Sequence, residues 1–273
     1  MSVRSDKAQD ERSDGMNKVQ TTGGISLSPE LFEQLYLAPK QNVHGHLRER
    51  FGNPTPIAIG GLMLCTTSLA MVLLEWQGAG GFAGAANVAC YIYVGGLLLL
   101  LGGIGEWIIG NTFPAVLFII HGGFWTAFGY TIIPSIGAYG AYSTTGVAAD
   151  GLKEPQFFAT FAFSLVAMAI VSTFFTIAGL RTNVVLFVSL ALLVPTFAVI
   201  ASSFFAISHG QLERARNLQH AGGGLLFAVS CTGWYVFLSM LLASVDFPIA
   251  LPVGDLSTVI VGKSSRLASK GEV

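Results

Sequence analysis

The chain has 273 residues, of which 52% are hydrophobic and only 11% are charged, and its net charge is −1. A soluble domain usually carries about 25% charged residues, so this chain lacks the polar side chains that would cover a water-facing surface. The near-zero net charge gives no reason to expect a nucleic-acid partner. The three cysteines lie far apart inside apolar runs, which indicates neither a disulfide framework nor a metal site. We therefore expect an integral membrane protein.

Residues 1–50 are polar and mixed in charge, with Gly-Gly and Ser-Pro pairs that interrupt regular structure. We predict a largely disordered cytoplasmic tail. Within it, Ser28 and Pro29 suit the start of a helix, so residues 28–37 are either a short interfacial helix or a transient turn. The first apolar run begins only after Phe51, so we expect no N-terminal signal peptide.

Six apolar segments follow, each close to the ~20 residues that a helix needs to cross a bilayer. Alternating strand patterns are absent, so the sequence predicts an all-α polytopic membrane domain over residues 51–244 and a cytoplasmic tail over residues 245–273. A longer loop is expected over residues 137–156. The predicted spans are 55–76, 86–109, 114–136, 157–180, 184–207 and 221–244.

Lysine and arginine near the predicted helix ends set the expected orientation, because these residues are more frequent on the cytoplasmic side. With the N-terminus inside, the cytoplasmic side holds about twice as many of them as the outer side. We therefore predict that both termini are cytoplasmic. The inner set is Lys40, Arg48, Arg50, Arg181, Lys263, Arg266 and Lys270, and the outer set is Lys153, Arg214 and Arg216.

The sequence contains no metalloprotease, nucleophile-elbow or phosphate-loop motif, and its charged residues lie mostly at the predicted helix ends. We expect neither an enzyme nor a bound cofactor. Glycine is abundant, with 33 residues, and small residues let membrane helices approach closely. The composition thus favours a tightly packed helix bundle.

Three polar groups near or inside the predicted spans are candidates for function. Asn53 and Pro54 suit the start of the first span. This start either attracts a small anion through its free backbone N–H groups or is only the start signal of a membrane helix. Glu106, just before the turn that starts at Gly110, is either a functional carboxylate or an acceptor that fixes the turn. His121 is the only histidine within an apolar span, and it is either a proton-linked, pore-lining group or a side chain satisfied by a neighbouring helix.

Several ordered motifs resemble those of the acetate uptake transporter family, also called the Gpr1/Fun34/YaaH family. Its signature Asn-Pro-Ala-Pro-Leu-Gly-Leu is similar to the segment that begins at Asn53, and its Gly-Asn-Thr-Phe turn is matched intact. The long N-terminal tail resembles the fungal branch. The matching residues are Asn53, Pro54, Thr55 and Pro56 in the signature, and Gly110, Asn111, Thr112 and Phe113 in the turn, with Glu106 before it.

The resemblance implies six helices per protomer and a homo-hexamer similar to urea channels. It also implies a plasma-membrane location and a pathway in each protomer for acetate-like monocarboxylates. The family's constriction has Phe, Tyr and Leu at positions that here are Leu62, His121 and Leu193. A glutamine usual in the second span is here Leu99. The substitutions fall where selectivity is expected to be set.

We therefore interpret the chain as a transporter or channel for acetate and similar short-chain monocarboxylates, with membrane lipid and protons as its other partners. The altered residues leave two alternatives open. One is a channel for another small solute, such as ammonia, an alcohol or urea. The other is a membrane sensor or scaffold that has kept the fold and lost the pathway.

Overall fold

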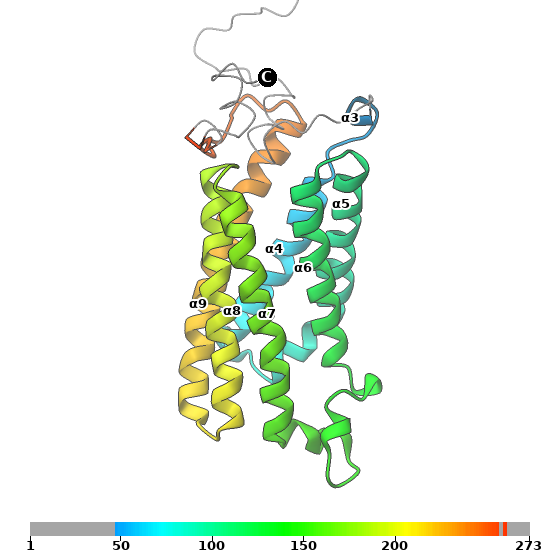
Figure 1. The fold of residues 1–273 in the computed structure, drawn as a ribbon, viewed down its shortest axis with the longest axis vertical. Coiled ribbons are helices and arrows are strands. Elements are labelled where there is room, and N and C mark those ends of the chain that lie inside the picture. Colours follow the sequence, from blue (N-terminus) through cyan, green and yellow to red (C-terminus); the bar gives the residue numbers. More distant parts are fainter. Residues whose placement is uncertain (1–46, 257–258, 261–273) are drawn as a thin grey trace, which may run out of the picture. The chain divides into compact units, whose positions relative to one another are not determined.

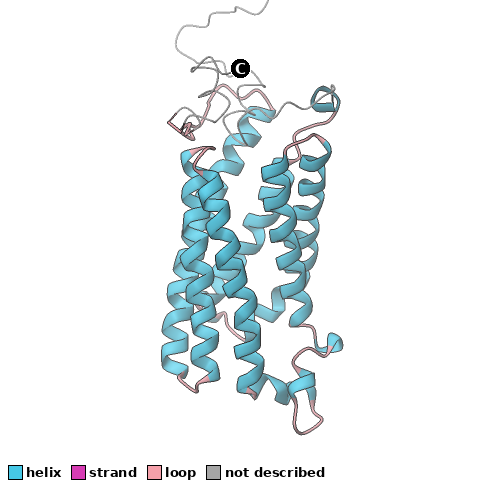
Figure 2. Ribbon diagram, in the orientation of Figure 1, coloured by secondary structure: helices cyan, strands magenta, loops and turns pink. Residues whose placement is uncertain are grey.

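The computed structural model describes residues 47–256 and 259–260, and within this part the side chains of residues 48, 49, 82 and 83 are not described. The possible helix at residues 28–37 and most of the two predicted tails lie outside the described residues. The described part consists of helices joined by turns and loops, with one isolated β-bridge between Asn183 and Asp255 (Figure 2).

Six spans among the described residues are long and apolar enough to cross a membrane, as the sequence predicts. Each of five spans is a single α-helix, and the other combines a π-helical segment with α5. A short helix, α3 (Leu47–Arg50), precedes them. The spans are α4 (Thr55–Leu73), the π-helical segment Cys90–Gly96 continued by α5 (Leu97–Ile108), α6 (Thr112–Thr131), α7 (Pro155–Gly179), α8 (Val184–Ser208) and α9 (Leu212–Ser244).

Successive spans run in opposite directions (Figure 1). Short turns join α5 to α6, α7 to α8 and α8 to α9, whereas the α4–α5 and α6–α7 connections are longer. Helix α7 packs on α8, α8 on α9, α9 on α4, α4 on α5 and α5 on α6. One end of the bundle holds the start of α4 and the α5–α6 turn, and we call it the Asn53 end. The opposite end holds the α8–α9 turn, and we call it the Glu75 end.

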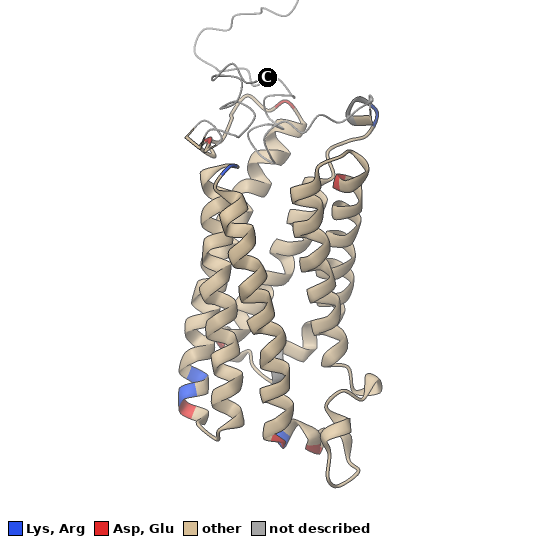
Figure 3. Ribbon diagram, in the orientation of Figure 1, with Lys and Arg blue, Asp and Glu red and all other residues tan. Residues whose placement is uncertain are grey.

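The last span differs from its predicted bounds. It begins at Leu212 rather than at residue 221, so Arg214 and Arg216 lie on its first turns and not in a loop. The prediction was wrong here because a hydropathy pattern detects only the apolar part of a helix, and a polar first turn can extend into the water layer. Figure 3 shows blue segments of α9 near the α8–α9 turn, at the Glu75 end.

The predicted start of the second span at residue 86 falls in a 3₁₀ helix, Phe82–Asn87, which leads through two helical residues into the π-helical segment that starts at Cys90. Here α4 and the second span approach closely. The Sγ atoms of the free cysteines Cys65 and Cys90 lie 3.4 Å apart. A β-carbon on Gly61 would lie 2.6 Å from the Val94 carbonyl oxygen, so only glycine permits this approach. The wide sequence spacing of the cysteines gave no sign of this contact.

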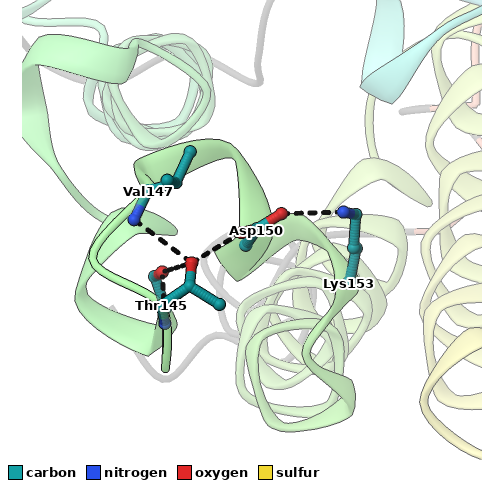
Figure 4. A network of polar contacts seen from close by, with 5 residues as sticks. Thr145, Val147, Asp150 and Lys153 are labelled. Atoms are coloured by element: carbon teal, nitrogen blue, oxygen red, sulfur yellow. Dashed lines mark hydrogen bonds and ion pairs between the residues drawn. The ribbon is translucent and has the colours of Figure 1, made fainter.

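The long connection between α6 and α7 contains three 3₁₀ turns, at Pro134–Ile136, Gly140–Tyr142 and Ala148–Lys153. Asp150 links the part of this connection between Thr145 and Lys153 (Figure 4). Its carboxylate accepts hydrogen bonds from the Lys153 ammonium at 2.7 Å and from the Thr145 hydroxyl at 2.5 Å. The hydrogen bond from Lys153, followed by that from Thr145, lowers the pKa of Asp150 below its usual value. The expected loop is therefore ordered by local polar contacts.

Residues after α9 return to the α7–α8 turn. The Leu256 amide donates to the Thr182 carbonyl at 2.9 Å, and the Val184 amide donates to the Gly254 carbonyl at 3.0 Å. Val253 is buried in this contact. The start of the predicted C-terminal tail thus packs against the Asn53 end of α8, where Asn183 Oδ1 also accepts a hydrogen bond from the Leu186 amide at 2.8 Å.

Candidate functional site

A mainly apolar cavity lies between α4, α6, α7, α8 and α9, and we call it the chamber. The chamber has a volume of about 40 Å³. On the same measure, one water molecule needs roughly 10–15 Å³. The chamber therefore has room for one small organic solute. Its lining residues are Leu62, Thr66, Leu69, Leu73, His121, Phe124, Trp125, Phe128, Leu165, Leu193, Thr196, Phe197, Ile200, Phe204, Gln219 and Leu226.

Helix α6 supplies most of the aromatic wall. His121, Phe124, Trp125 and Phe128 recur at the i, i+3, i+4 and i+7 spacing that places residues on one face of a helix. Phe124 meets Phe197 of α8 edge-on, with ring centroids 5.2 Å apart. These contacts fix the width of the chamber by packing rather than by hydrogen bonds.

A second, smaller cavity lies between α4, α6, α8 and α9. On each of these helices its lining residues lie closer to the Asn53 end than the lining of the chamber does, as Ile59 precedes Leu62 and Leu117 precedes His121. The two cavities are therefore stacked along the bundle. The second cavity is lined by Ile59, Phe113, Pro114, Leu117, Phe118, Leu186, Val236 and Met240.

The three residues predicted for the constriction come together, because Leu62, His121 and Leu193 all line the chamber. They lie on three different helices. Leu99 does not line the chamber. It is fully buried in α5, and its β-carbon would lie 3.0 Å from a β-carbon added to Gly122 of α6. Leu99 therefore contributes to the α5–α6 contact.

His121 is the chamber's most distinctive polar group. Its side chain is only 2% exposed. The Nδ1 atom lies 2.8 Å from the Leu117 carbonyl oxygen. The Nε2 atom is buried and has no hydrogen-bond partner within the described part of the chain. The imidazole also packs beside Phe175 of α7, with centroids 5.7 Å apart. A buried ring nitrogen without a partner is costly unless a ligand or water completes it.

The Asn53 end contains a buried polar network centred on Glu106, which is fully buried. The Thr55 hydroxyl donates to Glu106 Oε1. Asn111 Nδ2 donates to Oε2 at 2.7 Å, and the Asn111 amide donates to the Glu106 carbonyl at 2.8 Å. Asn53 Oδ1 accepts from the Thr55 amide at 2.9 Å. The network ties α4, α5 and α6 together, and Asn111 in the α5–α6 turn donates two of its hydrogen bonds.

The remaining signature residues surround this network. Pro54 is buried directly before α4 and Pro56 is half-buried in its first turn. Gly110 has φ +86°, a left-handed conformation that favours glycine in the α5–α6 turn. Thr112 starts α6. Phe113 lines the second cavity, so the turn places one wall of that cavity.

Sequence reasoning missed the threonines and several of the aromatic residues that line the chamber. Thr66 and Thr196 are almost fully buried. The helical spacing on α6 was a usable signal for Phe128. No comparable signal marked Phe197 on α8, because nearly every residue around it is apolar.

The fold defines a polytopic helical membrane protein, with a mainly apolar cavity among its helices. The sequence model of the GPR1/FUN34/yaaH family matches residues 36–258, and the chain belongs to this family. Protein alcS of Aspergillus fumigatus is 38% identical over 234 residues, which cover 85% of this chain and 86% of the relative. The acetate transporter protein patA of Aspergillus clavatus is 28% identical over 206 residues, covering 76% and 79%.

The solved structure of the bacterial acetate channel SatP is similar in fold. Its TM-score is 0.56 at 20% sequence identity, and the match covers 75% of this chain and 99% of that chain. This likeness confirms the predicted fold class of six membrane helices. Named relatives include an acetate transporter, and the similar solved structure is an acetate channel, so the expectation that the chain is not an enzyme is also confirmed.

Proposed function

We propose that the chain moves acetate and similar short-chain monocarboxylates across a membrane, through the chamber and linked to protons. The observation that carries the proposal is His121, which lines an otherwise mainly apolar chamber of one-solute size and whose buried Nε2 atom has no hydrogen-bond partner among the described residues. The names of relatives such as patA support acetate as the solute class. Protein alcS carries no solute in its name.

The chamber supports a link to protons. No carboxylate, lysine or arginine is among its lining residues. A carboxylate that enters without a proton would lose its hydration and gain no opposite charge, which is costly in an apolar cavity. Entry with a proton avoids this cost. Glu106 is not among the lining residues, and its printed contacts join α4, α5 and the α5–α6 turn.

The test is uptake of labelled acetate into proteoliposomes, with and without an inward proton gradient. The wild type is compared with Leu193→Trp, which fills the chamber, and with Leu64→Trp, which changes an exposed position of α4. We expect uptake that rises with the gradient, is blocked in Leu193→Trp and persists in Leu64→Trp. If folded wild-type protein gave no uptake above empty vesicles, another small solute or a sensor role would replace acetate transport.

The homo-hexamer, the plasma-membrane location and the cytoplasmic position of both termini stay predictions. The orientation rests on the lysines and arginines near the helix ends. Protease protection of terminal tags in sealed vesicles tests it. The oligomeric state is tested by the mass of the detergent-solubilised protein.

A further inference from the structure

The tautomer of His121 follows from its hydrogen bond. The Nδ1 atom lies 2.8 Å from the Leu117 carbonyl oxygen, and a carbonyl oxygen can only accept. Nδ1 therefore carries a proton and donates it. In a neutral imidazole the other nitrogen then has no proton and is an acceptor. The Nε2 atom, which has no partner among the described residues, thus carries a free lone pair on a side chain that lines the chamber.

The neutral imidazole is the form that these surroundings favour. His121 is the only titratable side chain among the chamber's lining residues. The rings packed beside it are Phe175 of α7 and Phe197 of α8, with centroids 5.7 Å and 6.5 Å away. No carboxylate faces it from these contacts, so a buried imidazolium would have no counter-charge.

Two other polar groups of the lining are also acceptors. The Thr66 hydroxyl donates to the Leu62 carbonyl at 2.9 Å, and the Thr196 hydroxyl donates to the Leu192 carbonyl at 2.7 Å. Each hydroxyl has one proton, so only its lone pairs remain for a solute. The side chains of the lining that can donate are the Trp125 indole and the Gln219 amide.

We propose that His121 Nε2 makes the chamber selective for solutes that donate a hydrogen bond, so that a monocarboxylate passes as the undissociated acid and not as the carboxylate. This inference rests on the proposed function and deepens it. An undissociated acid donates its O–H to Nε2 and keeps a carbonyl oxygen for a donor. A carboxylate has acceptor oxygens only, and these face an acceptor. Small neutral amides and alcohols meet the same requirement.

The first arm of the test is tracer exchange of acetate across proteoliposomes with the same pH and total acetate on both sides. The rate of protein-free vesicles is subtracted. If the undissociated acid is the passing form, the protein-dependent rate falls about tenfold per pH unit once the pH exceeds the pKa of acetic acid. A rate that stays constant or rises with pH shows passage of the anion and overturns the proposal, while acetate transport itself stands.

The second arm avoids any change of pH. Acetamide and acetone are neutral and similar in size, but only acetamide donates a hydrogen bond. Each is tested as a competitor of acetate exchange at one fixed pH. We expect acetamide to compete and acetone to compete much more weakly. Equal competition by the two solutes contradicts the proposal.

Variants identify the acceptor. His121→Met replaces the nitrogen at similar size with a thioether sulfur, which is only a weak acceptor, and His121→Gln restores an acceptor oxygen. The preference for acetamide over acetone should fall between about twofold and tenfold in His121→Met, which is the effect of about one hydrogen bond, and should return in part in His121→Gln. His209→Gln, at the exposed α8–α9 turn, is the control and should keep the preference. An unchanged preference in His121→Met removes His121 from this role.

Absence of acetate exchange in folded protein would be a failure of the proposed function, and it would leave the selectivity open to a separate measurement. Swelling of the same vesicles in acetamide, recorded by light scattering, provides it. Protein-dependent swelling that His121→Met reduces supports the donor-selective chamber without acetate transport. Swelling equal to that of empty vesicles overturns both proposals.

Discussion

Among the individual side chains, Thr55 and Glu106 form a buried contact that joins α4 to α5. The Thr55 hydroxyl donates to Glu106 Oε1, and both residues are fully buried. Thr55→Val keeps the shape and removes this donor. We expect the free energy of unfolding to fall by about 1–3 kcal/mol, because a buried acceptor loses a partner.

Thermal unfolding in detergent, followed by intrinsic fluorescence, measures this change. Thr55→Ser is the matched control, because it keeps the hydroxyl and removes one methyl group. A Thr55→Val protein as stable as the wild type, with Thr55→Ser less stable, would show that packing of the methyl group matters and the hydrogen bond does not.

Sequence reasoning at this scale found His121, Leu62 and Leu193, because a family resemblance marked their positions. It did not find the acceptor state of His121 Nε2, which depends on a 2.8 Å contact of the other nitrogen with the Leu117 carbonyl. It also left open whether Glu106 serves function or the turn. Only the placement of Thr55 and Asn111 around the carboxylate shows the turn-fixing contacts.

Between helices, glycine sets the distance of closest approach. A β-carbon on Gly61 would lie 2.6 Å from the Val94 carbonyl oxygen and 2.7 Å from the Leu98 β-carbon, whereas one on Gly123 would meet nothing within 4 Å. We expect Gly61→Ala to lower the free energy of unfolding by about 1–3 kcal/mol through overpacking. Gly123→Ala should be neutral or slightly stabilising.

The same unfolding assay compares the two variants. Equal stability of Gly61→Ala and Gly123→Ala would mean that α4 and the second span can separate without cost, and the close approach would then not be a requirement of the fold. The glycine content predicted close packing, but not which glycines provide it.

The spans themselves were largely predictable because a run of about 20 apolar residues has few alternatives to a membrane helix. The start of α9 was not, because its first turns carry Arg214 and Arg216 in place of apolar residues. The face of α8 that lines the chamber could also not be recognised from the sequence. Lipid and the chamber are both largely apolar, so a helix between them shows little amphipathic pattern.

For the chain as a whole, one exposed ion pair joins the early and late parts of the sequence at the Glu75 end. Arg216 Nη2 of α9 lies 2.5 Å from Glu75 Oε2 after α4, and His220 Nε2 lies 3.5 Å from the same oxygen. The hydrogen bond from Arg216 holds the pKa of Glu75 below its usual value. Because the folded-state pKa is lowered, this contribution to stability is present at neutral pH and is lost as the pH falls through that lowered pKa.

The difference in melting temperature between wild type and Glu75→Gln measures the contribution of this pair. We expect a small difference at neutral pH, since the pair is exposed, which shrinks as the pH falls and also shrinks in high salt. A difference that grows toward acid pH would contradict the assigned direction.

The central claim is that solute crosses through the chamber, and the accessibility of a cysteine placed there tests it most directly. Thr196 lines the chamber and is only 1% exposed. In Thr196→Cys proteoliposomes, a small neutral thiol reagent should stop labelled acetate uptake, and excess acetate at acid pH should slow that inhibition. The wild type, which keeps its three cysteines, should be inhibited far less. If modified Thr196→Cys carried acetate as fast as before, the solute path would not run through the chamber.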